Sequence, residues 1–496
     1  MQFDPAKDPG VVSPTDRSAV LRVLPSIMLP MFLAVVDQTI VATALPVIGA
    51  ATGNVQRVSW IVVGYLIAST IAAPVYGRLG DAFGRRRLMF IALAIFIVAS
   101  VLCAVSPTIE LLTAARVLQG LGGGGLMTLS QALIGEAVPP RERGRYQGYL
   151  AAVAVCANSF GPVAGGYLTE HFGWSSIFLI NVPIGMVALL LARSLPTKSP
   201  EPSNWRPDPI GLLLFTTLVA TSLLALEQAQ QLELSALPMV GALFAVAVLA
   251  LVLLVRQETR APSPFVPLTL LRQPVIWRSD ALVACHGAAL VSLITFLPIY
   301  LQVVRGQSPG ETGLLLIPIT IGIGTGALIT GRLVTQTRLT TIFPAIGLPL
   351  VTAAIVFLGF RIDEITTTTL VALLIWIGLF MGTVMGVVQV VVQSASGLQR
   401  LGEVAASVQV SRSMGAAFGT AVVAAVLFAA LSIKHPETAQ VFAAMIEHGP
   451  PVASSSPEQI LLHAEISNAF RIAFWSIAGF TALGSWLAFS IPLRRI

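Results

Sequence analysis

The residues best able to do chemistry in this sequence are charged side chains inside long apolar segments. Asp37 is the only acidic residue deep within such a segment, Asp280 lies near the edge of another, and Arg116 is a cation within a third. A charged side chain at the centre of a bilayer costs about 3 kcal/mol or more, so an acid at that depth is a functional candidate by default. One carboxyl and one guanidinium can support the binding and release of a proton there.

Helix geometry predicts that Asp37 and Arg116 lie at similar depth. Asp37 is about 13 residues, or roughly 20 Å of helix, from the start of its segment, and Arg116 is about 8 residues, or roughly 12 Å, from the opposite boundary of its own. If their helices adjoin, burial favours a protonated Asp37 and Arg116 favours an ionised one, so a conformational change can load or release a proton. The alternative is structural: Asp37 caps helix contacts, and Arg116 ties helices together through backbone carbonyls.

These side chains belong to a chain that is too apolar for soluble domains. Of its 496 residues, 55% are hydrophobic and 10% are charged, and the mean hydropathy is +0.85. Apolar runs of roughly 20 residues recur, and each is long enough to cross a hydrocarbon core about 30 Å thick. The sequence therefore predicts an all-α integral membrane protein with fourteen spans, at about 24–48, 58–76, 88–105, 108–135, 146–168, 177–195, 210–226, 236–255, 279–303, 312–334, 340–360, 370–394, 404–431 and 470–493.

The distribution of charge predicts how the chain crosses the membrane. Lys and Arg favour short cytoplasmic loops, and placing both termini in the cytoplasm puts most of the 29 Lys and Arg residues there. Only five then lie outside: Arg57, Arg305, Arg361, Lys434 and Arg471. We therefore expect a multi-pass protein of the cell (inner) membrane, with no cleaved signal peptide. Topology accounts for the net charge of +6, so no nucleic-acid partner is expected.

The sequence predicts neither a metal site nor a cofactor. Cys103, Cys156 and Cys285 each stand alone in an apolar run, which excludes a disulfide framework and a cysteine metal cluster. No metalloprotease motif, nucleophile elbow or pair of deep carboxylates is present, so we do not expect an enzyme. The expected partners are protons, small lipophilic substrates and the lipid bilayer, and the expected functional unit is a monomer.

A weak internal repeat predicts two halves. Gly77-Arg78-Leu79 recurs as Gly331-Arg332-Leu333, 254 residues later, and the same offset relates the starts of the first and ninth spans. Such repeats are typical of transporters that alternate access by rocking one bundle against the other. The predicted organisation is a cytoplasmic tail (1–22), a six-helix bundle (23–196), a linker with two inserted helices (197–256), a cytoplasmic linker (257–278) and a second six-helix bundle (279–496) with an external loop at about 432–469.

Four motifs in order resemble those of the major facilitator superfamily, in its fourteen-helix drug:proton antiporter branch. They are Asp37–Pro46 in the first span, Gly77–Arg87 after the second, Arg116–Gly120 in the fourth and Gly161–Gly166 in the fifth. The resemblance implies the major facilitator fold, with two six-helix bundles and two inserted helices. The sequence departs from the branch at Ser175, where an arginine is usual.

The segment from Gly77 to Arg87 is predicted to form a cytoplasmic gate. Gly77 and Gly84 permit a tight turn and close approach, and Asp81 can meet the positive end of a neighbouring helix. The resemblance implies that Asp81 docks on the N-terminus of the thirteenth span, near Val404. It also implies that Arg85 pairs with the acid that ends the fourth span, Glu136.

The fifth span is predicted to kink and to pack closely on its neighbours. Pro162 removes a backbone donor, and Gly161, Gly165 and Gly166 remove the side chains that would hold helices apart. In a transporter this favours a shape that is closed to the outside. The alternative is ordinary packing of small residues, because glycine is common in membrane helices.

The resemblance and the single deep acid together predict proton-coupled antiport that exports lipophilic drugs, either monovalent cations or neutral compounds. A divalent cation would lack a second counter-charge. The alternative is an exporter of the same fold for a specific metabolite, fatty acid or siderophore. Polar or aromatic side chains within spans are candidates for the substrate path, and each can equally serve packing: Phe32, Tyr65, Gln119, Asn158, Asn181 and Gln389.

Overall fold

The computed structural model describes residues 17–52, 57–195, 208–230, 237–261, 268–434, 442 and 457–495. Within these ranges the chain is helical, and its extended pairing is limited to an isolated bridge between Leu339 and Arg495. The N-terminal tail to residue 16, residues 197–207 of the predicted linker and inserted helices (197–256), and most of the predicted loop at 432–469 lie outside the described residues.

The first half of the chain packs around one apolar cluster of buried residues from Leu24 to Leu195. Helices α2 and α3 pack against α4, and α1 packs against α5. The helices of this half are α1 (Arg17–Thr52), α2 (Ser59–Phe83), α3 (Arg85–Ala104), α4 (Ile109–Ala137), α5 (Arg143–Phe172), α6 (Ser176–Leu179) and α7 (Asn181–Leu191).

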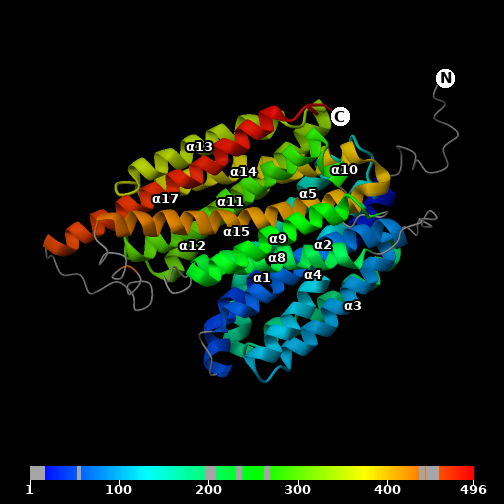
Figure 1. Ribbon diagram of the computed structural model, residues 1–496, viewed down its shortest axis with the longest axis horizontal. Coiled ribbons are helices and arrows are strands. Elements are labelled where there is room, and N and C mark those ends of the chain that lie inside the picture. Colours follow the sequence, from blue (N-terminus) through cyan, green and yellow to red (C-terminus); the bar gives the residue numbers. More distant parts are fainter. Residues whose placement is uncertain are drawn as a thin grey trace.

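The second half has an apolar cluster of its own, from Leu270 to Ile491. In Figure 1 these green-to-red helices lie above the blue and cyan helices of the first half. They are α10 (Leu268–Leu271), α11 (Pro274–Val303), α12 (Pro309–Thr337), α13 (Ile342–Arg361), α14 (Thr367–Ser396), α15 (Leu401–Lys434) and α17 (Pro457–Ser490).

Two further helices, α8 (Pro209–Gln230) and α9 (Leu237–Glu258), lie between the two groups in Figure 1. A small apolar cluster around Phe215 and Val219 of α8 contacts both halves: Ile67 and Ile71 of α2, and residues of α15 such as Met414. The inserted pair therefore covers the seam between the halves.

Thirteen helices within the described residues are long and apolar enough to cross a membrane. They include α6, α7 and the short turn after them taken as one span, Ser176–Ser194. Helix α4 is 29 residues long but less apolar, because it contains Arg116, Gln119 and the glycines from Gly122 to Gly125. It is shielded by α2 and α3, which pack along it. With α4 included, the described helices match the fourteen predicted spans, and the protein is an all-α integral membrane protein.

One local prediction was wrong in part. The loop was expected to begin at Gly77, but α2 continues through it to Phe83, and only Gly84 leaves the helical conformation, with a φ of 93°. The predicted sixth span is present over Ser176–Ser194, and Ile180, between α6 and α7, keeps helical dihedral angles. Asn181 lies at the first position of α7 and is buried.

Described contacts between the halves gather at the end of the bundle that carries Arg78, Arg85, Arg145 and Arg494, hereafter the arginine-rich end. Helix α5 follows α12 from Gly144, beside Gly331, to Val155, beside Gly324. Beyond that point Asn158, Phe160 and Val163 of α5 are exposed. The halves are thus closed against each other at the arginine-rich end.

Candidate functional site

The structure brings three helices of the first half, α1, α4 and α7, together at the carboxylate of Asp37. Its Oδ2 accepts a hydrogen bond from Arg116 Nη1 of α4 at 2.5 Å. Its Oδ1 accepts hydrogen bonds from Gln119 Nε2 at 2.8 Å and from Asn181 Nδ2 at 2.7 Å. Asp37 is 0% exposed and Arg116 is 1% exposed. The carboxylate is therefore sealed from solvent, fully hydrogen-bonded and balanced by one positive charge.

Arg116 is held from several directions. Its Nε donates to the carbonyl of Ile61 at 3.3 Å, and its Nη1 also donates to Gln119 Oε1 at 2.7 Å. The ring of Tyr65 lies 4.2 Å from the guanidinium carbon, within the range of a cation–π contact. The sequence offered two alternatives for Arg116, a pair with Asp37 and a bond to a backbone carbonyl of a neighbouring helix. Both contacts are present.

Gln119 links this group to α3. Its Nε2 donates to Ser100 Oγ at 2.8 Å as well as to Asp37, and its Oε1 accepts from the thiol of Cys103 at 3.5 Å. An amide has two donor hydrogens and two acceptor lone pairs. With the bond that Oε1 accepts from Arg116, these contacts use all four. Gln119 is therefore fixed in one orientation, with its NH2 group toward Asp37.

The glycines of α4 explain how the helices come this close. A Cβ at Gly120 would lie 2.5 Å from the carbonyl oxygen of Tyr65, and one at Gly122 would lie 2.8 Å from the backbone nitrogen of Phe96. Both distances are too short for any other residue. The absence of side chains lets α2 and α3 approach α4 and places Tyr65 and Ser100 beside the Asp37 group.

The six candidates for the substrate path fall into two sets. Tyr65, Gln119 and Asn181 are buried in the Asp37 group, where each has a contact within the first half. The others lie apart from this group. Phe32 is half-buried with its ring 6.1 Å from that of Phe160, Asn158 is exposed, and Gln389 is buried beside Gln393 of α14.

At the arginine-rich end, Asp81 of α2 caps the N-terminus of α15 in the other half. Its carboxylate accepts hydrogen bonds from the backbone N–H of Gly402 at 3.0 Å and of Glu403 at 3.1 Å. The first turn of a helix has unpaired N–H groups and a partial positive charge, so a carboxylate is stabilised there. This contact is the one that the resemblance implied, and its role as a gate stays a prediction.

Arg85 ties the same region together. Its guanidinium forms ion pairs with Asp81 on one side and with Glu136, at the end of α4, on the other. It also donates to the carbonyl of Leu398, which belongs to the second half, at 3.4 Å. The sequence reasoning missed a further ion pair across the halves, between Arg78 and Glu403. The sequence feature that could have predicted this pair is Glu403, an acid at the start of the thirteenth span.

Of the two roles predicted for Gly77, the close approach is confirmed and the turn is not. It lies within α2, and a Cβ there would be 2.5 Å from the carbonyl oxygen of Gly402. Gly77 and Gly402 thus let the two helix backbones touch. Gly84 keeps the predicted role, because its positive φ joins α2 to α3.

The glycines of α5 pack against α1. Cβ atoms at Gly161 and Gly165 would collide with Thr39 and Thr43, respectively, and with the backbone near Ile40. Gly166 has open space around it, so no close approach requires a glycine there. Helix α5 continues through Pro162 from Arg143 to Phe172. Close packing at Gly161 and Gly165 is thus present, whereas the effect on conformation stays a prediction.

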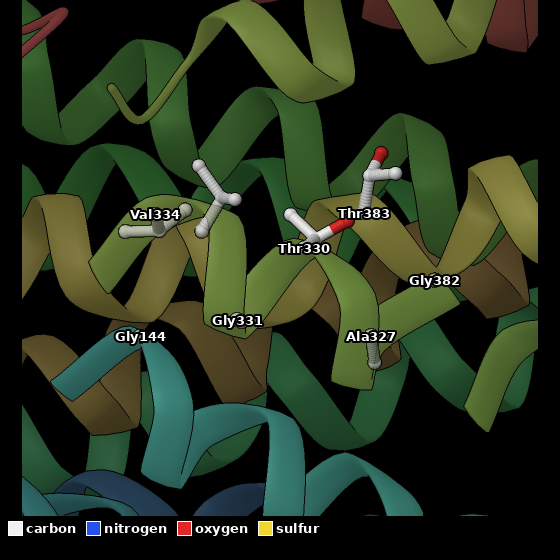
Figure 2. Close-up of a pocket in the computed structure, with 9 residues that line it drawn as sticks. Gly144, Ala327, Thr330, Gly331, Val334, Gly382 and Thr383 are labelled. Atoms are coloured by element: carbon white, nitrogen blue, oxygen red, sulfur yellow. The ribbon is translucent and has the colours of Figure 1, made fainter. Parts of the chain in front are cut away.

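A second contact between the halves joins α12 to α5. A Cβ at Gly331 would collide with the carbonyl of Gly144, and Thr335 Oγ1 accepts a hydrogen bond from the backbone N–H of Arg145 at 3.1 Å. Figure 2 shows a small cavity at this contact, lined by Thr330 and Val334 of α12, by residues of α14 and by Gly144.

The second half also holds buried polar side chains. Asp280 of α11, which the sequence places near a membrane edge, is 7% exposed. His286 of α11 bonds through Nε2 to the carbonyl of Met381 at 3.1 Å. Among the described residues, no group of three or more His, Cys, Asp or Glu side chains is arranged to hold a metal ion.

Known proteins and a protein-family profile match most of this chain. The profile of the Major Facilitator Superfamily matches residues 27–420. An uncharacterized MFS-type transporter of Mycobacterium tuberculosis is 35% identical over 413 residues, which are 83% of this chain and 59% of that protein. The chain thus spans about three fifths of the length of that relative.

Two further relatives carry names that refer to drugs. The multidrug transporter protein MdtP of Bacillus subtilis is 30% identical over 406 residues, covering 81% of this chain and 74% of its own length. The drug efflux pump JefA of M. tuberculosis is 30% identical over 424 residues, covering 83% and 81%.

Solved structures share the fold. The proton:xylose symporter XylE superposes with a TM-score of 0.64 over 96% of each chain, at 14% sequence identity. The human organic anion transporter MFSD10 superposes with a TM-score of 0.65 over 95% of this chain and 99% of its own, also at 14% identity. At this identity the likeness concerns the fold alone.

Proposed function

The chain belongs to the Major Facilitator Superfamily of transporters, and we propose that it exports lipophilic compounds in exchange for protons. Two relatives at 30% identity, a multidrug transporter and a drug efflux pump, support the drug-export part of this proposal. The proton-coupled part rests on the geometry around Asp37.

The observation that carries the proposal is the sealed pair of Asp37 and Arg116. Protonation of Asp37 would leave the buried guanidinium of Arg116 without its counter-charge. Leaving one charge of a buried pair uncompensated costs about 3–5 kcal/mol. About 1.4 kcal/mol is enough to change a conformational equilibrium tenfold. Binding of a single proton at Asp37 therefore supplies enough free energy to favour another arrangement of the helices.

The orientation of the protein in the membrane is inferred from the distribution of arginine. Arginine-rich loops favour the cytoplasm, so we infer that the arginine-rich end faces inward. The described conformation is then closed to the cytoplasm. In the proposed cycle, it releases substrate to the outside and receives a proton at Asp37, and the chain then opens inward to release the proton and bind substrate.

The proposed substrates are lipophilic and either neutral or singly charged. Monovalent cations are favoured over divalent ones because a divalent cation would need a second counter-charge besides Asp37. A second candidate is favoured by Arg412 of α15, which is half-buried and has no hydrogen bond or ion pair to any described side chain. An unpaired cation within the bundle suits an organic anion such as a fatty acid. Transport of a cationic dye or of a fatty acid separates the two.

The decisive test is transport in proteoliposomes with an imposed pH gradient. Wild-type protein is expected to move ethidium, a lipophilic cation, against its gradient as protons flow the other way. Asp37→Asn should insert normally and still bind the dye, but should lose the response to the pH gradient. Undiminished gradient-driven transport by this variant would exclude Asp37 as the proton carrier.

The matched control is Asp363→Asn, which makes the same chemical change in an acid with a 43% exposed side chain that pairs with Arg471 at the opposite end. It should transport like the wild type. Arg116→Lys keeps the charge but loses the planar guanidinium, whose Nη1 bonds Asp37 and Gln119 while its Nε bonds the carbonyl of Ile61. It should lower transport less than Asp37→Asn.

A further inference from the structure

Helix α11 buries a second carboxyl group, Asp280, in the half that lacks Asp37. Its side chain is 7% exposed, and its Oδ2 is buried with no hydrogen-bond partner in the described part of the chain. Its Oδ1 has one polar neighbour, the hydroxyl of Ser407 on α15, at 3.3 Å. Asp37, in contrast, accepts three hydrogen bonds from groups that include a guanidinium.

The hydrogen atoms around Asp280 can be counted. The Ser407 hydroxyl has one hydrogen, and its oxygen donates both to the carbonyl of Val404 at 3.0 Å and to Asp280 Oδ1 at 3.3 Å. Asp280 therefore receives at most a share of one hydrogen, and its Oδ2 receives none from the described residues. An ionised carboxylate needs more donors than this when it is buried. The poor supply of donors thus fits a protonated carboxyl group.

The charges around Asp280 point the same way. Arg278, one half-turn before it, donates to the carbonyl of Ser490 on α17. Glu403 on α15 pairs with Arg78, and Arg412, further along α15, lies beside His286. No ion pair to Asp280 occurs among the described residues of the helices packed on α11, whose other charged groups toward this end are Arg332, Arg338, Arg400 and Arg494. A buried carboxylate without a counter-charge is costly, so burial favours the neutral form.

We propose that Asp280 is a second proton-binding residue, loaded while the arginine-rich end is closed and discharged when that end opens. In the described conformation Asp280 carries the proton. When the halves separate at that end, water reaches Asp280; its O–H bond breaks, the proton passes to water, and the electron pair remains on the carboxylate. This proposal rests on the proposed proton antiport and assigns it a second proton.

The first test is the number of protons exchanged per dye molecule, obtained from the dye gradient that just balances a known pH gradient in proteoliposomes. Asp280→Asn should still transport ethidium, with a ratio lower by one proton than the wild type. Ser407→Ala, which removes the neighbouring hydroxyl but no acid, should keep the wild-type ratio. An unchanged ratio in Asp280→Asn would overturn the proposal.

The second test requires no substrate. Thr330→Cys places a thiol in the cavity of Figure 2, which is covered while α5 contacts α12. In a background without Cys103, Cys156 and Cys285, the labelling rate of this thiol reports opening of the arginine-rich end. Asparagine resembles a protonated aspartate, so Asp280→Asn should slow labelling and reduce its increase in alkaline buffer. Equal rates and equal pH dependence in both proteins would contradict the proposal.

The wild-type protein provides a test that does not depend on folding of the variant. Dicyclohexylcarbodiimide modifies protonated carboxyl groups in apolar surroundings, and peptide mass spectrometry locates the adduct. We expect modification at Asp280 but not at Asp37. An adduct at Asp37 alone would reverse the assignment. If wild-type protein moves no dye in response to a pH gradient, the proposed function fails, while the labelling and modification experiments still decide the state of Asp280.

Discussion

The two places where the halves meet share one backbone arrangement and differ in charge. Gly77 of α2 and Gly331 of α12 each bring their helix against a backbone carbonyl of the other half. Four residues later, Asp81 and Thr335 each accept a hydrogen bond from the first turn of the helix that they meet, α15 and α5, respectively. The offset of 254 residues relates both pairs, so the repeat that is weak in sequence is clear in these contacts.

Only the contact of α2 with α15 adds ion pairs. There Arg85 joins Asp81 and Glu136, and Arg78 joins Glu403. At the contact of α12 with α5, Thr335 takes the place of the acid, and its hydroxyl also donates to the carbonyl of Gly331. The difference indicates that glycine contact and helix capping are sufficient to dock the helices, whereas the ion pairs set how firmly one of the two contacts closes.

The largest effect is expected where both contacts are alike. Gly77→Val and Gly331→Val should each prevent closure, because a Cβ would overlap a backbone carbonyl that cannot move aside. Forcing extra atoms into packed helices costs typically about 1–3 kcal/mol and occasionally more, and we expect about 3 kcal/mol or more where the obstacle is backbone. Ethidium transport in proteoliposomes should fall roughly tenfold or more in both variants. A loss in Gly77→Val with normal transport in Gly331→Val would show that only the charged contact must close.

The two capping residues should differ in the next test. Asp81→Ala removes a carboxylate that bonds two N–H groups and pairs with Arg85, so it should destabilise the closed form by about 2–3 kcal/mol. Thr335→Ala removes one neutral cap, for which about 1 kcal/mol is typical. Labelling of Thr330→Cys measures both effects. Equal increases in labelling would show that charge adds nothing to the capping.

A double-mutant cycle isolates one ion pair. Arg85→Ala and Glu136→Ala should each impair transport, and the double variant should be little worse than either, because each single change already removes the pair. Residues in contact commonly show coupling of about 0.5–3 kcal/mol. Strictly additive effects, with each single variant near wild type, would mean that this region acts only as a topology anchor.

The smallest effect is expected from an ion pair that lies away from both contacts. Arg57 and Glu110 pair with N–O separation of 3.1 Å, but their side chains are 61% and 60% exposed. Exposed pairs contribute about 0–1 kcal/mol, so Glu110→Gln should change neither transport nor thermal stability by a measurable amount. A large loss of transport would indicate that an ion pair affects transport even when it lies away from the contacts between the halves.

Residue types and spacing were sufficient to predict much of the molecule. The length of apolar runs predicted the fourteen spans, because a helix must supply all backbone hydrogen bonds inside a bilayer. Depth along each helix predicted that Asp37 and Arg116 could meet, and they lie 2.5 Å apart. Both inferences depend on distance along one helix, which the sequence specifies directly.

Some expectations depended on which helix lies beside which, and these were less reliable. Close approach at Gly77 was predicted, but its partner Gly402, more than 300 residues away, was not. Tyr65, Gln119 and Asn181 were candidates for the substrate path or for packing; the structure places them around Asp37, and a role in the path stays a prediction. The sequence alone does not distinguish a polar residue that lines a substrate path from one that packs around a buried charge.

The sequence by itself thus determined that the chain crosses a membrane many times, in two related halves, with one acid and one guanidinium at matching depth. Only the tertiary structure decided that Asp37 is fully paired while Asp280 is buried almost without partners. The physical reason is that a side chain's state of charge depends on its neighbours in space. In a bundle of long helices those neighbours come from segments far apart in the chain, brought together by packing of small residues.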